Sequence, residues 1–168
     1  MVLRGSGLAA GALAIWLAAG SVFGGGAGTP PTQEGIPVTS EATVETLDLD
    51  AYQWQNRIIL IFAPAAGDTM YAQQLAIFAT REAELAERDL LIGQFPADEQ
   101  GSFAGQPVAR AGGAALRERY DVAGGDFALI LIGKDGGVKL AAAEPVSTAR
   151  LFELIDSMPM RQQEERGE

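Results

Sequence analysis

The sequence contains no cysteine and no histidine, and its only lysines are Lys134 and Lys139. Without cysteine the chain cannot form a disulfide, a catalytic thiolate, an iron–sulfur cluster or a zinc site with sulfur ligands. Without histidine it lacks the usual general base and the commonest transition-metal ligand. Any metal site would need oxygen ligands, which suit Ca²⁺ or Mg²⁺. We expect neither a cofactor nor a bound metal ion.

Basic residues are also scarce, because 12 lysines and arginines stand against 22 acidic residues and give a formal net charge of −10. Affinity for nucleic acids comes mostly from lysine and arginine contacts with phosphate. Since the sequence has no basic run, we expect no nucleic-acid partner and predict a protein partner. The chain has 168 residues, 48% of them hydrophobic, which is enough for the core of one domain.

The N-terminal 27 residues carry one charge, Arg4, followed by an apolar run over residues 8–23 and the small residues Gly25-Gly26-Ala27. A positive start, an apolar stretch and a small-residue exit are typical of a secretory signal peptide. We predict cleavage after Ala27 and a periplasmic or secreted protein. The alternative is an uncleaved segment that anchors the domain to a membrane, facing outside. Residues 28–46, rich in Pro, Thr, Glu and Gly, are interpreted as a flexible linker.

Residues 47–161 alternate short apolar runs with amphipathic stretches, which predicts one α/β domain with a parallel strand pair and crossover helices. Asp135-Gly136 indicates a tight turn that closes a C-terminal antiparallel hairpin before the final helix. Residues 96–113 are interpreted as a loose polar segment, Asp48 and Asp50 as the exposed face of an edge strand, and residues 162–168 as a frayed tail. The expected strands are 57–63, 89–95, 127–132 and 138–142, and the expected helices are 68–88, 114–120 and 148–158, ended by Pro159.

This order of elements resembles the thioredoxin fold, and Ile61-Phe62-Ala63-Pro64 looks like the strand that leads into a thioredoxin active-site turn. The resemblance implies a three-layer α/β/α sandwich with a mixed central sheet of four to five strands. It also implies a groove at the start of the first helix, with the missing cysteines near Ala66 and Thr69 and the usual cis-proline near Asp126 or Phe127. The candidate groove residues are Pro64, Ala66, Gly67, Asp68, Thr69, Asp126 and Phe127.

A second set of residues carries a closer resemblance over residues 47–161. These residues are Trp54, Asn56, Arg57, Gln73, Arg88, Asp89, Arg117, Tyr120, Gly133, Lys134, Asp135, Gly136, Lys139, Asp156, Met158, Pro159 and Arg161. The chain resembles the thioredoxin-like family named domain of unknown function 4174, found in bacterial exported proteins and in animal extracellular-matrix proteins of the sushi-repeat and coiled-coil-domain kind. The resemblance implies a fold and an extracytoplasmic setting, and no particular reaction.

Each candidate side chain has a structural and a functional interpretation. Asp68 is interpreted as a helix cap or as an acid–base group. Asp68 and Asp126 together are interpreted either as two solvated acids or as a pair that shares a proton or holds Ca²⁺. Thr69 as a nucleophile would lack an activating base. Arg57, Lys134 and Lys139 are interpreted as partners in salt bridges or as a binding site for an anionic ligand. For Trp54 the alternatives are packing against the sheet edge and an exposed binding platform.

The absence of thiols excludes thiol oxidoreductase and peroxiredoxin activity from the candidate groove. The sequence therefore predicts a non-catalytic binding or scaffold module, with contact surfaces at the groove beside Asp68 and at residues 101–113. The alternative is an enzyme that uses carboxylates, or a Ca²⁺- or Mg²⁺-binding domain, in the same groove. A degenerate peroxidase is a third possibility, for which we expect no measurable turnover of peroxide.

Overall fold

The structure is a computed structural model that describes residues 45–167, so the predicted signal peptide and nearly all of the predicted linker lie outside the described residues. The strands are β1 (Arg57–Ala63), β2 (Leu90–Pro96), β3 (Gly101–Phe103), β4 (Gln106–Val108), β5 (Ala128–Ile132) and β6 (Val138–Ala142). The helices are the 3₁₀ turn η1 (Asp50–Tyr52), α1 (Thr69–Ala79), α2 (Glu82–Glu87), α3 (Arg110–Arg119), α4 (Thr148–Asp156) and α5 (Pro159–Glu165). Among these helices, none is long and apolar enough to cross a bilayer.

The strands form one mixed sheet in the order β4-β3-β2-β1-β5-β6. Strands β1 and β2 run parallel, whereas β5 pairs antiparallel with both β1 and β6. The parallel pair and the closing hairpin therefore follow the prediction, and the turn is closed by Gly136 N–H donating to the Gly133 carbonyl at 2.9 Å. The sheet has six strands, where four to five were expected.

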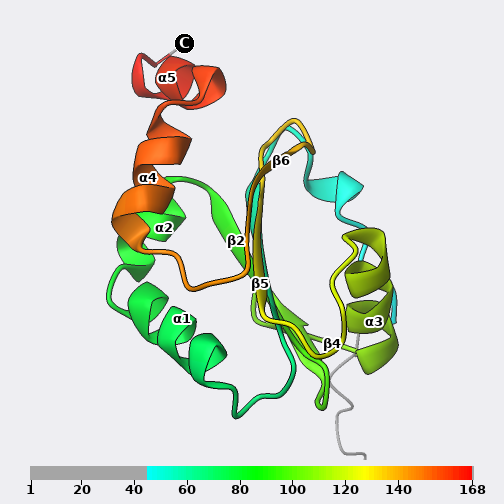
Figure 1. The fold of residues 1–168 in the computed structure, drawn as a ribbon. Helices are drawn as coiled ribbons and strands as arrows, with labels where there is room; N and C mark the ends of the chain where they lie inside the picture. Colours follow the sequence, from blue (N-terminus) through cyan, green and yellow to red (C-terminus); the bar gives the residue numbers. More distant parts are fainter. Residues whose placement is uncertain (1–44, 168) are drawn as a thin grey trace, which may run out of the picture. The chain divides into compact units, whose positions relative to one another are not determined.

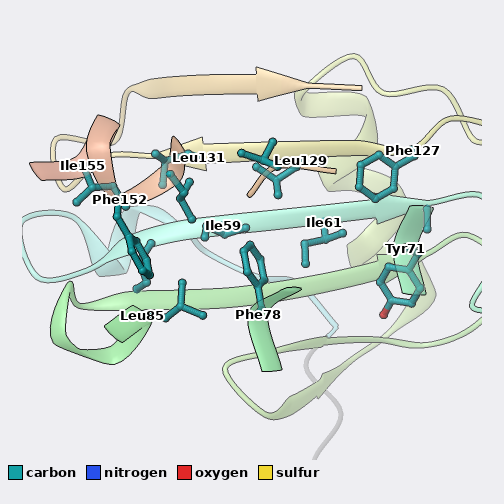
Figure 2. Close-up of a cluster of buried hydrophobic side chains, with 14 residues drawn as sticks. Ile59, Ile61, Tyr71, Phe78, Leu85, Phe127, Leu129, Leu131, Phe152 and Ile155 are labelled. Carbon is teal, nitrogen blue, oxygen red and sulfur yellow. The ribbon is translucent and has the colours of Figure 1, made fainter. Parts of the chain in front are cut away.

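Helices cover both faces of the sheet, with α1, α2 and α4 on one face and α3 on the other (Figure 1). All seven residues of β1 are buried, and their side chains alternate between the two faces. Ile59 and Ile61 pack in the cluster beneath α1 and α4 (Figure 2), whereas Leu60 and Phe62 pack beneath α3. This explains the unbroken apolar run in the sequence, because a strand covered on both faces needs no polar side.

The extra strands come from the segment that was predicted to be loose. Residues Phe103 and Val108 are buried, and a two-residue turn joins β3 to β4. Ala104 has φ of 49° and Gly105 has φ of 80°, as a type I′ hairpin turn requires at both central positions. The prediction of a loose segment was wrong because an Ala-Gly turn and a proline in β4 conceal the hairpin.

Two helix boundaries also differ from the prediction. The helix expected over residues 68–88 is broken at Thr80, whose hydroxyl donates to the Ile77 carbonyl at 2.9 Å, and α2 then packs Leu85 into the core. Helix α3 begins at Arg110, four residues before the expected start. The helix was predicted to start too late in the sequence because Gly112 and Gly113 disfavour a helix. In the structure a side chain at Gly113 would lie 3.3 Å from the Phe95 ring, so the glycine permits close packing.

The ends of the domain correct three further predictions. Pro159 does not simply end the last helix, because α4 ends at Asp156 and Pro159 is the first residue of a new helix, α5. Proline is well suited to a first helical position, where its missing N–H leaves no bond unmade. Residues 162–165 are therefore helical, and the prediction of a frayed tail was wrong. Asp48 and Asp50 lie at a 3₁₀ turn where an edge strand was expected, with Asp50 N–H donating to the Asp48 carboxylate at 3.0 Å.

Candidate functional site

The start of α1 is shaped by Asp68, which follows β1 and the exposed turn at Gly67. Asp68 has an extended conformation with ψ of 138°, and its Oδ1 accepts a hydrogen bond from Tyr71 N–H at 2.9 Å. It therefore caps the helix, as its structural interpretation predicted. Nearby, Ala66 N–H donates to Asp98 Oδ1 at 2.9 Å, and the Tyr71 hydroxyl donates to Gln94 Oε1 at 2.9 Å.

Replacement of Asp68 by alanine should lower the free energy of unfolding by about 1 kcal/mol, the usual cost of losing an N-cap side chain. The cause is the Tyr71 N–H, which would lose its acceptor at the helix end. Urea unfolding followed by circular dichroism measures this change. Asp68→Asn is the matched control, because asparagine also caps helices well, and a loss as large in Asp68→Asn as in Asp68→Ala would contradict the capping role.

Arg117 of α3 fixes the loop that faces the start of α1. Arg117 is 8% exposed, and its guanidinium donates to the main-chain carbonyls of Ala63 and Phe95, at the carboxyl ends of β1 and β2. It also donates to the carbonyls of Ala123 at 2.9 Å and Asp126 at 3.5 Å. Burial lowers the pKa of Arg117, partly offset by the charge of Asp126. One buried side chain thus ties residues 123–126 to the end of the sheet.

A groove of about 620 Å³ lies beside this loop, and we call it the β6 groove. It is lined by Met70 in the first turn of α1, by Asp126 and Phe127, and by Ala141 at the end of β6. Phe127 also belongs to the buried cluster that contains Tyr71 of α1, which places the loop near that helix (Figure 2). The remaining lining residues are Tyr120, Asp121, Val122, Gly125, Ala128, Ile130, Ala142 and Ala143.

The structure divides the predicted groove. Asp126 and Phe127 line the β6 groove, whereas Pro64, Ala66, Gly67, Asp68 and Thr69 do not line it. Asp68 is occupied as a helix cap, and the structure does not place it in the hollow that Asp126 lines. Within residues 45–167 no three acidic side chains are grouped so that they could hold a metal ion. The β6 groove thus combines apolar side chains with exposed polar groups, among them the acidic residues Asp121 and Asp126.

Most of the charged residues that carry the family resemblance lie around Arg57, at the start of β1. This position is roughly 20 Å from the carboxyl end of β1, given the rise per residue of a strand. Arg57 is 1% exposed and donates to Glu164 at 3.2 Å and to the Arg88 carbonyl at 3.0 Å. Lys134 Nζ lies 2.7 Å from Glu164 and 2.9 Å from Asp89. Burial alone would raise the pKa of Glu164, but hydrogen bonds from Lys134 and Arg57 outweigh it, and the pKa is lowered.

The same network continues to α4 and α5. Arg88 forms two hydrogen bonds with Asp156, at 2.9 Å and 2.7 Å, and stacks 4.2 Å above the Phe152 ring. The Arg88 hydrogen bond lowers the pKa of Asp156. Arg161 is 9% exposed and lies 3.2 Å from Glu165 and 3.6 Å from Asp156. The salt-bridge interpretation of the basic residues is therefore confirmed, and Lys139 likewise pairs with Asp135 at 2.6 Å.

Sequence reasoning missed two polar residues, Glu164 in this network and Gln74 elsewhere in the core. Glu164 was assigned to a frayed tail, although the spacing Arg161-x-x-Glu164-Glu165 directly after Pro159 is a signal for a helix with ion pairs. Gln74 is fully buried and forms two hydrogen bonds with the main chain of Val146, whereas its neighbour Gln73, the residue carrying the resemblance, is exposed.

The other family residues have varied environments. Trp54 is 65% exposed, so the expectation that it packs against the sheet was wrong. It has φ of 64°, in the left-handed region, and its N–H donates to the Lys134 carbonyl at 2.7 Å. Asn56 donates to the Asp89 carbonyl at 3.5 Å. Tyr120 and Met158 are partly buried and pack against the two cores.

The arrangement of a parallel pair, an antiparallel β5–β6 hairpin and helices on both faces defines a thioredoxin-like fold. Solved structures agree: thioredoxin peroxidase I of Plasmodium yoelii superposes with a TM-score of 0.53, at 16% identity, over 73% of this chain and 82% of that chain. The reduced 2-Cys peroxiredoxin of Plasmodium vivax gives a TM-score of 0.52, at 13% identity, over 71% and 85% of the two chains. At this identity the likeness shows the fold alone.

The chain belongs to the family described as domain of unknown function (DUF4174), whose model matches residues 48–164. Among curated relatives, it is 29% identical to Coiled-coil domain-containing protein 80 of Danio rerio, over 79% of this chain and 17% of that protein. It is 26% identical to Sushi repeat-containing protein SRPX of Homo sapiens, over 82% of this chain and 30% of that protein. The chain therefore spans less than a third of the length of these two relatives.

Proposed function

We propose that this protein is an exported, non-catalytic binding module whose β6 groove receives an extended segment of a partner protein. The observation that carries the proposal is the groove itself, which lies beside the loop of residues 123–126 and includes Ala141 and Ala142, the last two residues of the edge strand β6. The chain has no thiol or imidazole to perform chemistry there. Export is supported by the charge, apolar run and small residues of positions 1–27.

The sheet edge supports an extended ligand. Strand β6 is the last strand of the sheet and is bonded to β5 on one side. An edge strand offers unpaired main-chain N–H and C=O groups, and extended peptides bind such edges by adding a strand. Because Ala141 and Ala142 are small, a ligand backbone can approach β6 closely. In a strand-addition complex, main-chain hydrogen bonds supply affinity and side-chain contacts supply selectivity.

The side chains of the groove indicate which segments fit. Ala128 and Ile130 on β5 provide an apolar floor, and Met70 adds an adaptable apolar rim. Asp121 and Asp126 are the charged residues of the lining. We therefore expect an extended segment with small or aliphatic residues and at least one lysine or arginine near Asp126.

Binding of the full chain to an array of ten-residue peptides tests the proposal, with dissociation constants then measured by calorimetry for the strongest peptides. The variant Ala141→Trp fills the groove and should weaken binding at least tenfold. Ala83→Trp is the matched control, because Ala83 is exposed on α2 and outside the groove, and it should leave affinity within twofold. Asp126→Asn should weaken binding of lysine-containing peptides specifically.

Two outcomes would overturn the proposal. One is that no peptide in the array binds with a dissociation constant below about 1 mM, the weak end of specific recognition. The other is that Ala141→Trp and Ala83→Trp bind the selected peptides equally well, which would place the contact away from β6.

A further inference from the structure

A second hollow, of about 280 Å³, lies at the Arg57 end of the sheet, and we call it the lysine pocket. It shares no residue with the β6 groove. Both lysines of the chain, Lys134 and Lys139, line it together with Arg57. Asp135 is the one carboxylate in its lining. The lining therefore holds three cations and one carboxylate, while Glu164 and Asp89, which pair with Arg57 and Lys134, lie outside the lining.

Two of these cations are held in place before any ligand arrives. Arg57 is fixed by Glu164 and by the Arg88 carbonyl, and Lys134 is fixed by Glu164 and Asp89. Their partners lie on α5 and in the turn before β2, so the positions of the charges depend on the fold and not on one loop. Charged groups that are already ordered lose little entropy on binding, and they therefore favour a ligand of opposite charge.

The third cation is available for exchange. Lys139 has a side chain that is 32% exposed, and its Nζ pairs with Asp135 at 2.6 Å. Exposed ion pairs contribute little to stability because solvent screens them. Lys139 can therefore leave Asp135 for the carboxylate of a ligand at small cost. The Lys139 side chain lies close to the main chain of Gly133, because a Cβ at position 133 would be 2.6 Å from Lys139 Cε.

Arg57 also has a donor without a partner. Its Nε is buried and makes no hydrogen bond within residues 45–167, although the other guanidinium nitrogens are bonded. Buried donors in native proteins are nearly always satisfied by protein, water or a ligand. Arg57 is itself one of the residues that line the lysine pocket, so this unpaired donor belongs to a residue of the lining.

The rest of the lining is largely apolar. Met158 comes from the connection between α4 and α5, Pro159 and Met160 come from the first turn of α5, and Ser157 adds one hydroxyl. Methionine side chains adapt to ligands of different shape. The volume lies just below the usual range for pockets that bind drug-sized molecules, of about 300–1,000 Å³, and so favours a small ligand.

We propose that the lysine pocket binds a small carboxylate ligand. Its apolar group packs against Met158 and Met160, and its carboxylate group pairs with Lys139 at the end of the pocket near Arg57. Two sources supply this chemistry: a free organic acid, and the C-terminal carboxylate of a peptide that ends in an apolar residue. The proposal does not depend on the peptide segment proposed for the β6 groove, because the two sites use different residues and opposite charges.

Isothermal calorimetry on the full chain tests the proposal with two pairs of probes. The first pair is 4-phenylbutyrate and its primary amide, and the second is N-acetyl-Gly-Phe with a free or an amidated C-terminus. We expect each carboxylate to bind at least tenfold more tightly than its amide, and the tighter of the two acids identifies the source. Raising the salt concentration should weaken carboxylate binding, because part of the attraction is screened.

Variants locate the site. Lys139→Gln removes the charge and keeps most of the stem, and it should weaken carboxylate binding at least tenfold. Arg81→Gln is the control, because Arg81 is an exposed cation paired with Glu84 outside the pocket, and it should change affinity less than twofold. The proposal is overturned if neither carboxylate binds at 10 mM, roughly the limit of measurable affinity, if acid and amide bind equally, or if Lys139→Gln binds as the unmodified protein does.

Discussion

Replacing Arg57 with methionine should lower the free energy of unfolding by about 3 kcal/mol, the lower end of the cost of removing one partner of a buried ion pair. The side chain is 1% exposed, and its loss deprives Glu164 of one cation and the Arg88 carbonyl of a donor. The cost lies at the lower end because Glu164 is 27% exposed and keeps Lys134. Urea denaturation monitored by circular dichroism measures this change.

The double variant Arg57→Met/Glu164→Leu separates loss of the pair from loss of packing. Replacing both members of a buried pair by apolar residues is often close to neutral, because no uncompensated charge remains. We therefore expect the double variant to recover at least half of the stability lost in Arg57→Met. If Arg57→Met lowers the free energy of unfolding by less than 0.5 kcal/mol, about the effect of an ordinary surface change, then Arg57 does not hold α5 in place.

Replacing Arg117 with methionine should lower the free energy of unfolding by about 1–3 kcal/mol, the cost of leaving a buried carbonyl without its donor. Two buried carbonyls lose a donor, and the first of them keeps the Ala97 N–H at 3.0 Å as a second donor. These are the carbonyls of Ala63 and Phe95, at the carboxyl ends of the two parallel strands. The loop of residues 123–126 would also lose its attachment to the sheet. Chemical denaturation measures the first effect, and faster amide hydrogen exchange over residues 121–127 measures the second.

Arg119→Met is the matched control for Arg117→Met, because both arginines lie on α3. The Arg119 side chain is 50% exposed and pairs with Asp50 at 3.3 Å, so its loss should cost less than about 0.5 kcal/mol. Equal stability of the two variants would contradict the role of Arg117. Arg117→Lys should fall between them, since one ammonium cannot reach four carbonyls as the guanidinium fork does.

The core strands could be predicted from the sequence because their burial has a local signature. The run Ile58 to Phe62 has no polar alternation, and a strand covered on both faces needs none. Asp68 could be predicted as a helix cap because it follows Pro64 and precedes a helical spacing of apolar residues. Each of these features depends on residues that are close together in the sequence, so it can be recognised without the structure.

The hairpin β3–β4 and the helix α5 escaped prediction because their signals are ambiguous. Pro107 lies in β4 at the edge of the sheet, where the absence of an N–H is tolerated, although proline usually argues against a strand. Pro159 indicates either the end of one helix or the start of the next, and the sequence alone does not separate the two.

The contacts of Arg117 and Glu164 could not be predicted because they join distant parts of the chain. The acceptors of Arg117 on β1 and β2 lie 54 and 22 positions away. Nothing in the local pattern distinguishes Arg117 from the exposed arginine two residues later. Glu164 is one of several acids near the C-terminus, and its role depends on the placement of β1 and the β5–β6 turn.

The pair of Arg57 and Glu164 spans 107 residues of the chain. During synthesis the arginine at the start of β1 therefore meets its carboxylate only after these 107 residues have emerged. A chain that stops after Met160 would leave that guanidinium sealed in the interior without its counterion. Chains truncated at Met160, and nonsense changes near it, should accordingly yield proteins that are cleared by proteases and not merely shortened ones.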